Sequence, residues 1–190
     1  MNTGLYFGSF NPIHIGHMAI ANFMIEFSDL EQLWFVVSPQ NPLKEKKSLL
    51  KDYHRLEMVR LAVEDDDRFR ASDIEFHMPT PSYTIDTLTY LEEKNPGRNF
   101  QLVMGADGLR TFHKWKHAEL IAENYHRLIY PRPGIDMERI SRLPNATVVD
   151  APLMEISSSF IRNAIRQGKD VRHLMPAKAY HYMREMHFYE

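Results

Sequence analysis

The chain has 190 residues, of which 44% are hydrophobic and 25% are charged, close to the average for folded globular proteins. It contains no cysteine, which excludes disulfide frameworks, thiolate metal sites and a cysteine nucleophile. Lysine and arginine number 23 against 25 acidic residues, so the formal net charge of −2 lacks the basic excess of a general nucleic-acid binder. We therefore expect one folded domain over residues 1–190 with no nucleic-acid partner.

Short apolar runs alternate along the chain with segments of helical period. The runs of strand length are residues 5–7, 33–37, 100–104, 128–130 and 146–149. Apolar side chains three and four positions apart predict helices over residues 16–27, 53–64, 84–93 and 115–124. From Ser157 to the C-terminus the period is again helical, with breaks at Gly168 and Pro176. The alternation indicates an α/β fold, a Rossmann-like doubly wound parallel sheet with a C-terminal helical segment.

Two further features concern location and flexibility. No stretch approaches the roughly 20 apolar residues of a membrane span, and the N-terminus lacks a basic region followed by an apolar run. We therefore expect a soluble, cytoplasmic protein without a membrane partner. Residues 39–47, rich in proline and lysine, predict a mobile active-site loop, because the elements on both sides are needed for one sheet. The sequence is equally compatible with a monomer and with a homo-oligomer.

The segment after the first predicted strand has the features of a phosphate-binding loop. Ligands bind parallel sheets at the carboxyl ends of the strands. Here Gly8 and Ser9 allow backbone N–H groups to approach a phosphate. Asn11-Pro12 predicts a turn, and a helix that begins near His14 offers its positive N-terminus to an anion. The spacing matches neither GxGxxG nor GxxxxGK[ST], which disfavours hydride transfer and P-loop chemistry.

His14 and His17 stand three positions apart and therefore share a face of the first helical turn. Three interpretations apply: a metal pair, structural caps, or donors to a reacting phosphate. A metal site needs a third ligand, usually acidic, and none lies nearby. We favour the phosphate donors and expect no metal held by protein ligands alone. Gly16 between the histidines leaves room for a base or ribose.

The serines at positions 157–159 precede an amphipathic run, which is typical of a helix N-cap. The same end of a helix also binds phosphate, so capping and binding are compatible. Arg162, one turn further, can present its guanidinium to a phosphate as a fork.

Three other residues have two interpretations each. Asp107 follows a predicted strand, where it could accept ribose hydroxyls or cap a helix. Trp115 could belong to the core, but its polar neighbours favour a partly exposed ring that stacks on a ligand. Lys44 lies in a charge run that is equally typical of a solvated loop.

Two distant motifs carry a family resemblance. GSFNPIHIGH over residues 8–17 is similar to the (T/H)xGH signature of the nucleotidylyltransferase superfamily, and residues 156–162 are similar to its ISSTxIR segment. The chain resembles in particular the bacterial nicotinate-mononucleotide adenylyltransferases. The resemblance also covers residues 39–46, 81–88, 104–107, 112–115 and 132–134. It implies transfer of AMP from ATP to nicotinate mononucleotide, with Mg²⁺ bound mainly through the ATP phosphates, in NAD biosynthesis.

The resemblance also implies the site residues. The ATP site would consist of Gly8, Ser9, Phe10, His14, His17, Gly105, Asp107, Ile156, Ser158, Ser159 and Arg162. Of these, His14, His17 and Arg162 would be catalytic, because they would contact the reacting phosphates. The mononucleotide would contact the backbone N–H of Thr84 and stack on Trp115, with Lys44 and Arg132 as weaker candidates. The chain departs from the common pattern at Asn11, Ser159 and Lys116, where many relatives have Asp, Thr and an aromatic residue.

Four alternatives remain at this stage. A pantetheine-phosphate adenylyltransferase has threonine at the position of His14, and an enzyme for nicotinamide mononucleotide differs in reading an amide rather than a carboxylate. Class I aminoacyl-tRNA synthetases carry similar HIGH strings, but this chain is too short for their anticodon domain and has no KMSKS-like loop. A nucleotide-binding regulator without turnover would have no need of His14, His17, Ser158 and Arg162 together.

Overall fold

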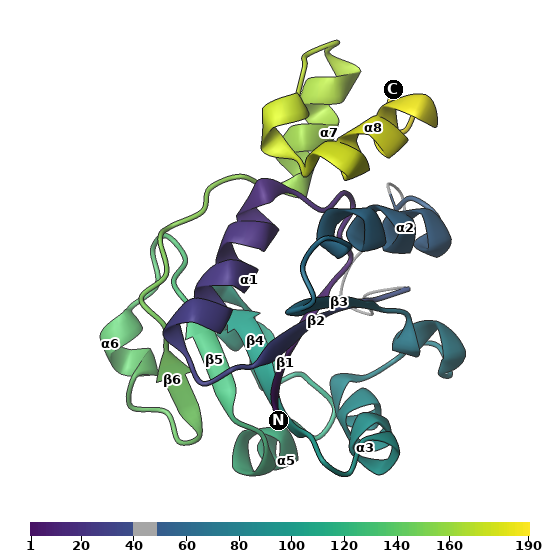
Figure 1. Ribbon diagram of the computed structural model, residues 1–190. Helices are drawn as coiled ribbons and strands as arrows, with labels where there is room; N and C mark the ends of the chain where they lie inside the picture. Colours follow the sequence, from purple (N-terminus) through teal and green to yellow (C-terminus); the bar gives the residue numbers. More distant parts are fainter. Residues whose placement is uncertain (40–48) are drawn as a thin grey trace.

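The sheet of this computed structural model, which describes residues 1–39 and 49–190, has six parallel strands in the order β3-β2-β1-β4-β5-β6. The strands are β1 (Asn2–Gly8), β2 (Gln32–Val37), β3 (Phe69–Ser72), β4 (Asn99–Gly105), β5 (Arg127–Tyr130) and β6 (Ala146–Val148). The order reverses between β1 and β4, as in Rossmann-like folds. The predicted doubly wound parallel sheet is confirmed (Figure 1).

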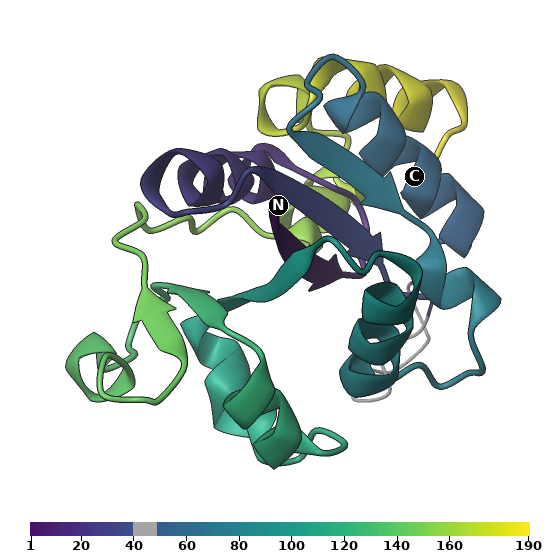
Figure 2. The ribbon, with the colours of Figure 1, turned by 60° about the horizontal axis from the view of Figure 1, so that its bottom comes forward.

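Helices cover both faces of the sheet (Figure 2). They are α1 (Ile15–Phe27), α2 (Asp52–Val63), α3 (Thr84–Lys94), α4 (Leu109–Phe112), α5 (Ala118–Asn124), α6 (Met137–Ile140), α7 (Ser158–Arg166) and α8 (Ala177–Glu185), with short 3-10 turns η1 (Ile74–His77), η2 (Ala106–Gly108) and η3 (Arg172–Leu174). None of the helices in the described ranges is long and apolar enough to cross a membrane.

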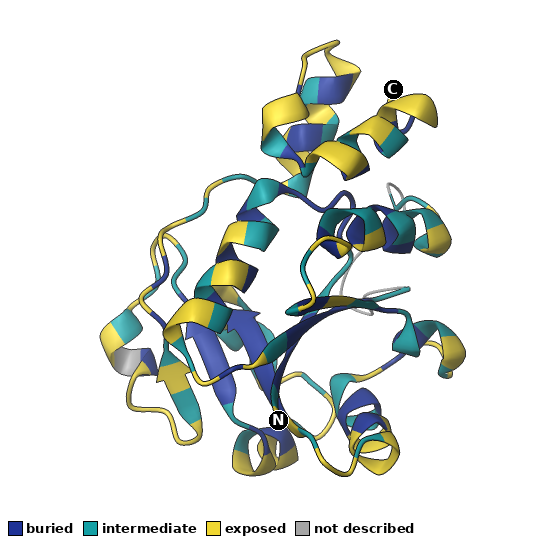
Figure 3. Cartoon of the chain, viewed as in Figure 1, coloured by how far each residue is buried: buried dark blue, intermediate teal, exposed yellow. Residues whose placement is uncertain are grey.

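Side chains alternate along the strands and thereby build a core on each face. In β1, Tyr6 belongs to the core that also contains residues of α1, α2, α7 and α8, whereas its neighbour Leu5 belongs to the core with residues of α3 and α5. The inner strands β2, β1, β4 and β5 are consequently mostly buried, whereas the edge strand β6 and the outer faces of the helices are partly or fully exposed (Figure 3). This explains why the four inner strands appear in the sequence as continuous apolar runs.

The C-terminal helical segment packs against α2. Ala179 and Met183 of α8 are buried in the same core as Leu56 and Val59 of α2. At the edge of this contact His54 and Tyr182 share a hydrogen bond of 2.8 Å between Nδ1 and the hydroxyl. The predicted segment is confirmed, and it is part of the main core.

The structure differs from the prediction at β3 and at the start of α5, and the short helices α4 and α6 were not predicted. Strand β3 was missed because only Phe69 and Ser72 are buried in it, and Arg70 between them is exposed at the sheet edge. The helix predicted over residues 115–124 begins only at Ala118, because His117 adopts a left-handed backbone with φ of 52°. Trp115 precedes this helix and packs its ring on Phe112, with 5.3 Å between centroids.

Candidate active site

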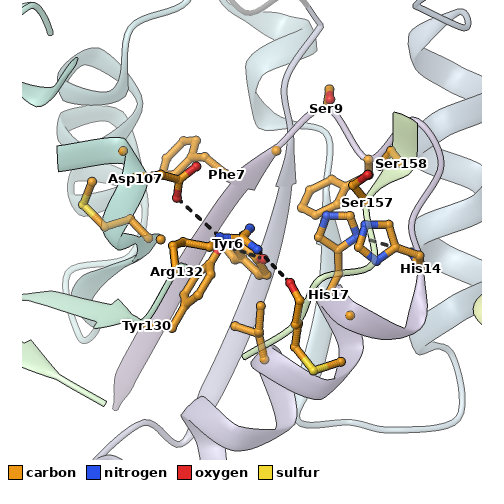
Figure 4. Close-up of a pocket in the computed structure, with 18 of the residues that line it drawn as sticks. Tyr6, Phe7, Ser9, His14, His17, Asp107, Tyr130, Arg132, Ser157 and Ser158 are labelled. Atoms are coloured by element: carbon orange, nitrogen blue, oxygen red, sulfur yellow. Dashed lines mark hydrogen bonds and ion pairs between the residues drawn. The ribbon is translucent and has the colours of Figure 1, made fainter. Parts of the chain in front are cut away.

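A cavity of about 820 Å³ opens at the carboxyl ends of β1, β4 and β5. This is where the strand order reverses, the usual ligand site of such sheets. Its wall comes from the loop after β1, from the end of β4 with η2, and from residues 154–159 with the first turn of α7. Figure 4 shows side chains from these segments facing one another.

Most residues predicted for the site line this cavity. Those of the predicted ATP site are Gly8, Ser9, Phe10, His14, His17, Gly105, Asp107, Ile156, Ser158, Ser159 and Arg162. Trp115 and Arg132, predicted for the mononucleotide, line the same cavity. Thr84 is the first residue of α3 and does not line it. Lys44, with most of the predicted loop at residues 39–47, lies outside the described residues.

The loop after β1 folds tightly over its own aromatic residue. Phe10 has a φ of 44° and is 2% exposed, and its ring packs edge-on against His17 with centroids 5.1 Å apart. A Cβ added to Gly8 would lie 2.8 Å from the Phe10 ring, so any side chain at this position would displace the packed ring. Phe10 is therefore a buried support for the loop as well as part of the cavity wall.

His14 and His17 lie face to face at the start of α1, with ring centroids 3.7 Å apart and an interplanar angle of 24°. The backbone N–H of His14 donates to Nδ1 of His17 at 3.2 Å, which places the proton of the neutral His17 ring on Nε2. Burial, reinforced by the charge of Arg132, lowers the pKa of His14 from 6.5 to about 4. Without a ligand, His14 is thus a neutral imidazole at pH 7. The hydrogen bond between the two residues supports the capping interpretation, and the phosphate interpretation stays a prediction.

The opposite wall carries a polar chain of side chains. The guanidinium of Arg132 pairs with the carboxylate of Asp107 at 3.4 Å and donates to the hydroxyl of Tyr130 at 3.3 Å. That hydroxyl in turn lies 3.2 Å from the hydroxyl of Tyr6. Asp107 is within η2 and caps no helix, and its side chain is 63% exposed, which leaves the carboxylate accessible to a ligand.

The second motif docks directly on the first. Ser157 is the N-cap of α7 and accepts the N–H of Phe160 at 3.2 Å. Ser158 donates to the carbonyl of Pro12 at 2.9 Å, and Arg162 donates to the carbonyl of Asn11 at 2.7 Å. Two segments about 150 residues apart therefore form one wall of the cavity.

Residues 5–164 match the family model described as cytidylyltransferase-like. A protein of Flavobacterium johnsoniae named "Probable nicotinate-nucleotide adenylyltransferase" is 50% identical over 192 residues, which covers 100% of both chains. A protein of Christiangramia forsetii with the same name is 49% identical over 190 residues, 99% of this chain and 98% of its own. The chain belongs to the nicotinate-nucleotide adenylyltransferase family.

Solved structures agree with this family at the level of the fold. The Plasmodium falciparum nicotinic acid mononucleotide adenylyltransferase complexed with NaAD superposes with a TM-score of 0.83 at 21% identity, covering 99% of this chain and 97% of that one. The same protein complexed with APC gives a TM-score of 0.82. The Rossmann-like architecture is therefore that of nicotinic acid mononucleotide adenylyltransferases.

Thr84 and Trp115, two of the residues predicted for the mononucleotide, lie on segments of this family member that contact each other. Trp115 lines the cavity from the turn between α4 and α5 and is partly buried against Phe112, a position that is compatible with both of its predicted roles. The next residue, Lys116, pairs with Asp86 in the first turn of α3 at 2.9 Å. This ion pair ties the turn of Trp115 to the helix that begins with Thr84.

Tyr6, Tyr130 and Arg55 are among the residues that line or support the cavity and that sequence reasoning missed. Tyr6 and Tyr130 line it, and burial, followed by the interaction with Tyr130, raises the pKa of Tyr6. The sequence feature that could have indicated Tyr6 is its position two residues before Gly8, at the end of the first strand. Arg55 is 0% exposed and donates to the carbonyls of Ser9, Ser38, Pro39 and Leu50. The sequence feature that could have indicated this role is the position of Arg55 on the core-facing side of α2.

Proposed function

We propose that the cavity transfers AMP from ATP to nicotinate mononucleotide, forming nicotinate adenine dinucleotide and pyrophosphate. The observation that carries this proposal is the convergence of the loop after β1 and the start of α7 on one cavity at the reversal of strand order. The names of relatives about 50% identical over the full chain support the choice of substrates. The activity belongs to NAD biosynthesis, because its product is the deamido form of that dinucleotide.

The reaction requires positioned charge more than covalent chemistry. A phosphate oxygen of the mononucleotide attacks the α-phosphorus of ATP, the bond to the bridging oxygen breaks, and pyrophosphate leaves with the electron pair. Donors that are fixed before the reaction stabilise the negative charge that spreads over these oxygens. In our proposal these donors are Nε2 of His17, the hydroxyl of Ser159, and the guanidinium of Arg162, which holds the departing pyrophosphate. The hydroxyl of Ser158 would join them by turning from the carbonyl of Pro12 to the phosphate.

His14 would change its protonation state as the nucleotide binds. Its pKa of about 4 without a ligand results from burial and from the charge of Arg132. A polyphosphate beside the ring stabilises the imidazolium and raises this pKa, so that His14 takes up a proton together with the ligand. Neutral His14 would thereby avoid a buried, uncompensated charge in the free enzyme.

A divalent metal with ATP is general among nucleotidyltransferases, and we propose Mg²⁺ as the ion here. No group of three histidine or acidic side chains within the described parts of the chain could hold a metal ion. The ion would thus be bound by phosphate oxygens and water, as Mg²⁺ commonly is. MgATP is then the substrate, and the protein contributes donors to its phosphates.

Recognition of the pyridine ring would take place between Trp115 and α3. Trp115 is partly exposed in the cavity and can stack on a heteroaromatic ring. The N-terminus of α3 at Thr84 offers backbone N–H groups and a positive dipole end, which favours a carboxylate over an amide. Closure of the gap between Thr84 and the cavity on ligand binding would complete this site.

The test is pyrophosphate release from MgATP by the purified protein, with nicotinate mononucleotide, nicotinamide mononucleotide and phosphopantetheine compared at equal concentrations. We expect clear preference for nicotinate mononucleotide. Preference for either rival would retain the transfer chemistry and refute the assigned acceptor. If no pyrophosphate were released with any of the three acceptors, despite measurable ATP binding, the enzymatic function would be refuted and a nucleotide-binding regulator favoured.

A further inference from the structure

Asn11 connects the two motifs of the cavity to the end of the chain. Its backbone carbonyl accepts a hydrogen bond from Nη1 of Arg162 at 2.7 Å. Its side-chain Oδ1 accepts two more, from the N–H of Leu50 at 3.2 Å and from the hydroxyl of Tyr189 at 2.7 Å. Asn11 is itself buried, so these bonds fix both its backbone and its side chain. The orientation of Arg162 thus depends on how Asn11 is held.

Tyr189 reaches Asn11 from the last turn of the chain. The C-terminus lies beside α2 (Figure 1), and Phe188 and Tyr189 pack against the main core. The backbone of Tyr189 is left-handed, with φ of 69°, and so is that of His187, with φ of 54°. Non-glycine residues adopt this conformation at an energetic cost, which the surrounding contacts must offset. The strained turn aims the phenol ring at the loop after β1.

The hydroxyl of Tyr189 acts as a donor over the working range of pH. Burial raises its pKa above the ordinary value, although the nearby charges of Arg162 and Arg55 oppose this rise. Neither arginine forms an ion pair with a carboxylate among residues 1–39 and 49–190. A neutral phenol and a neutral asparagine therefore position Arg162 without cancelling its charge, which stays available to an anionic ligand.

We propose that Tyr189 is a positioning residue for adenylyl transfer: through Asn11 it fixes the carbonyl that orients the guanidinium of Arg162. This inference rests on the proposed function. Nη2 of Arg162 is held by Ser159 at 3.1 Å, so loss of the Asn11 contact would leave the guanidinium with one remaining hydrogen bond in the described part of the chain. Displacement of a reacting or stabilising group by about 1 Å can lower a rate by roughly 10²-fold.

The first variant is Tyr189→Phe, which removes one hydroxyl and keeps the packed ring. We expect kcat to fall roughly tenfold, because Arg162 remains present but is less well oriented. The KM for nicotinate mononucleotide should change by less than about twofold, because an interaction made mainly in the transition state affects kcat rather than binding.

Tyr182→Phe is a matched control. It removes a hydroxyl from the same C-terminal segment, one that is hydrogen-bonded to His54 at 2.8 Å and does not line the cavity. Both variants lose a single hydrogen bond and should unfold at similar temperatures. Only Tyr189→Phe should lower kcat, and an equal fall in both variants would overturn the proposal.

A double-mutant cycle separates positioning from general stability. In an Arg162→Lys background, Tyr189→Phe should lower kcat by less than about twofold, because the orientation of the guanidinium no longer matters. A further tenfold loss would overturn the inference, since Tyr189 would then act independently of Arg162. Asn11→Ala removes the acceptor of the same hydrogen bond and should reproduce the fall in kcat. It replaces Tyr189→Phe in the test if that variant does not fold.

The two proposals fail in different ways. A wild-type enzyme that releases pyrophosphate, with a Tyr189→Phe variant of equal kcat, would refute the role of Tyr189 and retain the proposed function. A folded wild-type protein that releases no pyrophosphate with any of the three acceptors would refute the proposed function, and the inference about Tyr189 would be refuted with it.

Discussion

Replacement of His17 by alanine tests the centre of the proposed mechanism. The ring of His17 receives the backbone N–H of His14 at its Nδ1, stacks on the ring of that residue and packs against Phe10. If its Nε2 donates to the phosphates in the transition state, His17→Ala removes one fixed donor. Loss of such a donor lowers kcat by roughly 10²-fold or more, which corresponds to about 2.7 kcal/mol.

The same substitution has a separate effect on stability. It removes the hydrogen bond from the N–H of His14, worth about 1 kcal/mol, and part of an aromatic cluster, worth about 1 kcal/mol more. We therefore expect the free energy of unfolding to fall by about 2 kcal/mol, leaving a folded protein under assay conditions.

The assay is steady-state pyrophosphate release together with urea unfolding. His126→Ala is the matched control, because His126 also makes one imidazole hydrogen bond, to Thr147 at 2.9 Å, and does not line the cavity. A folded His17→Ala enzyme with near-normal kcat would refute the role of His17, whatever its stability.

Three further predictions concern stability and the acceptor. The pKa of His14 is about 4 in the folded chain against an ordinary value of 6.5, so the unfolded state binds the extra proton as pH falls from 6.5 to 4. Between pH 6.5 and 4 the free energy of unfolding, measured with urea, should fall by about 3 kcal/mol more in wild type than in His14→Gln. The same pH dependence of this free energy in both proteins would contradict the prediction. Trp115→Ala should raise the KM for nicotinate mononucleotide roughly tenfold with little change for ATP, whereas an unfolded variant would favour a purely structural role. Arg55→Leu should lower the unfolding free energy by about 3 kcal/mol or more, since it leaves buried carbonyls without donors. A much smaller decrease in this free energy, measured by thermal or urea unfolding, would refute the supporting role of Arg55.

The sequence by itself determined the parts of this protein that depend on local pattern. Continuous apolar runs predicted β1, β2, β4 and β5, because a strand buried on both faces excludes polar side chains. The loop after β1 was predicted from its own residues, because the glycines, the Asn-Pro turn and the start of α1 are contiguous. The position of the cavity followed from the rule that parallel sheets bind ligands at the carboxyl ends of their strands.

Only the tertiary structure decided which distant residues support that loop. Arg55 looks in the sequence like a charged residue on a helix, and Tyr189 like one aromatic residue among several at the chain's end. Folding brings the first beneath Ser9 and the second onto Asn11. The edge strand β3 and the place of Thr84 outside the cavity were likewise unpredicted. Each of these depends on packing between segments far apart in the chain, and residue spacing within one segment carries no information about such contacts.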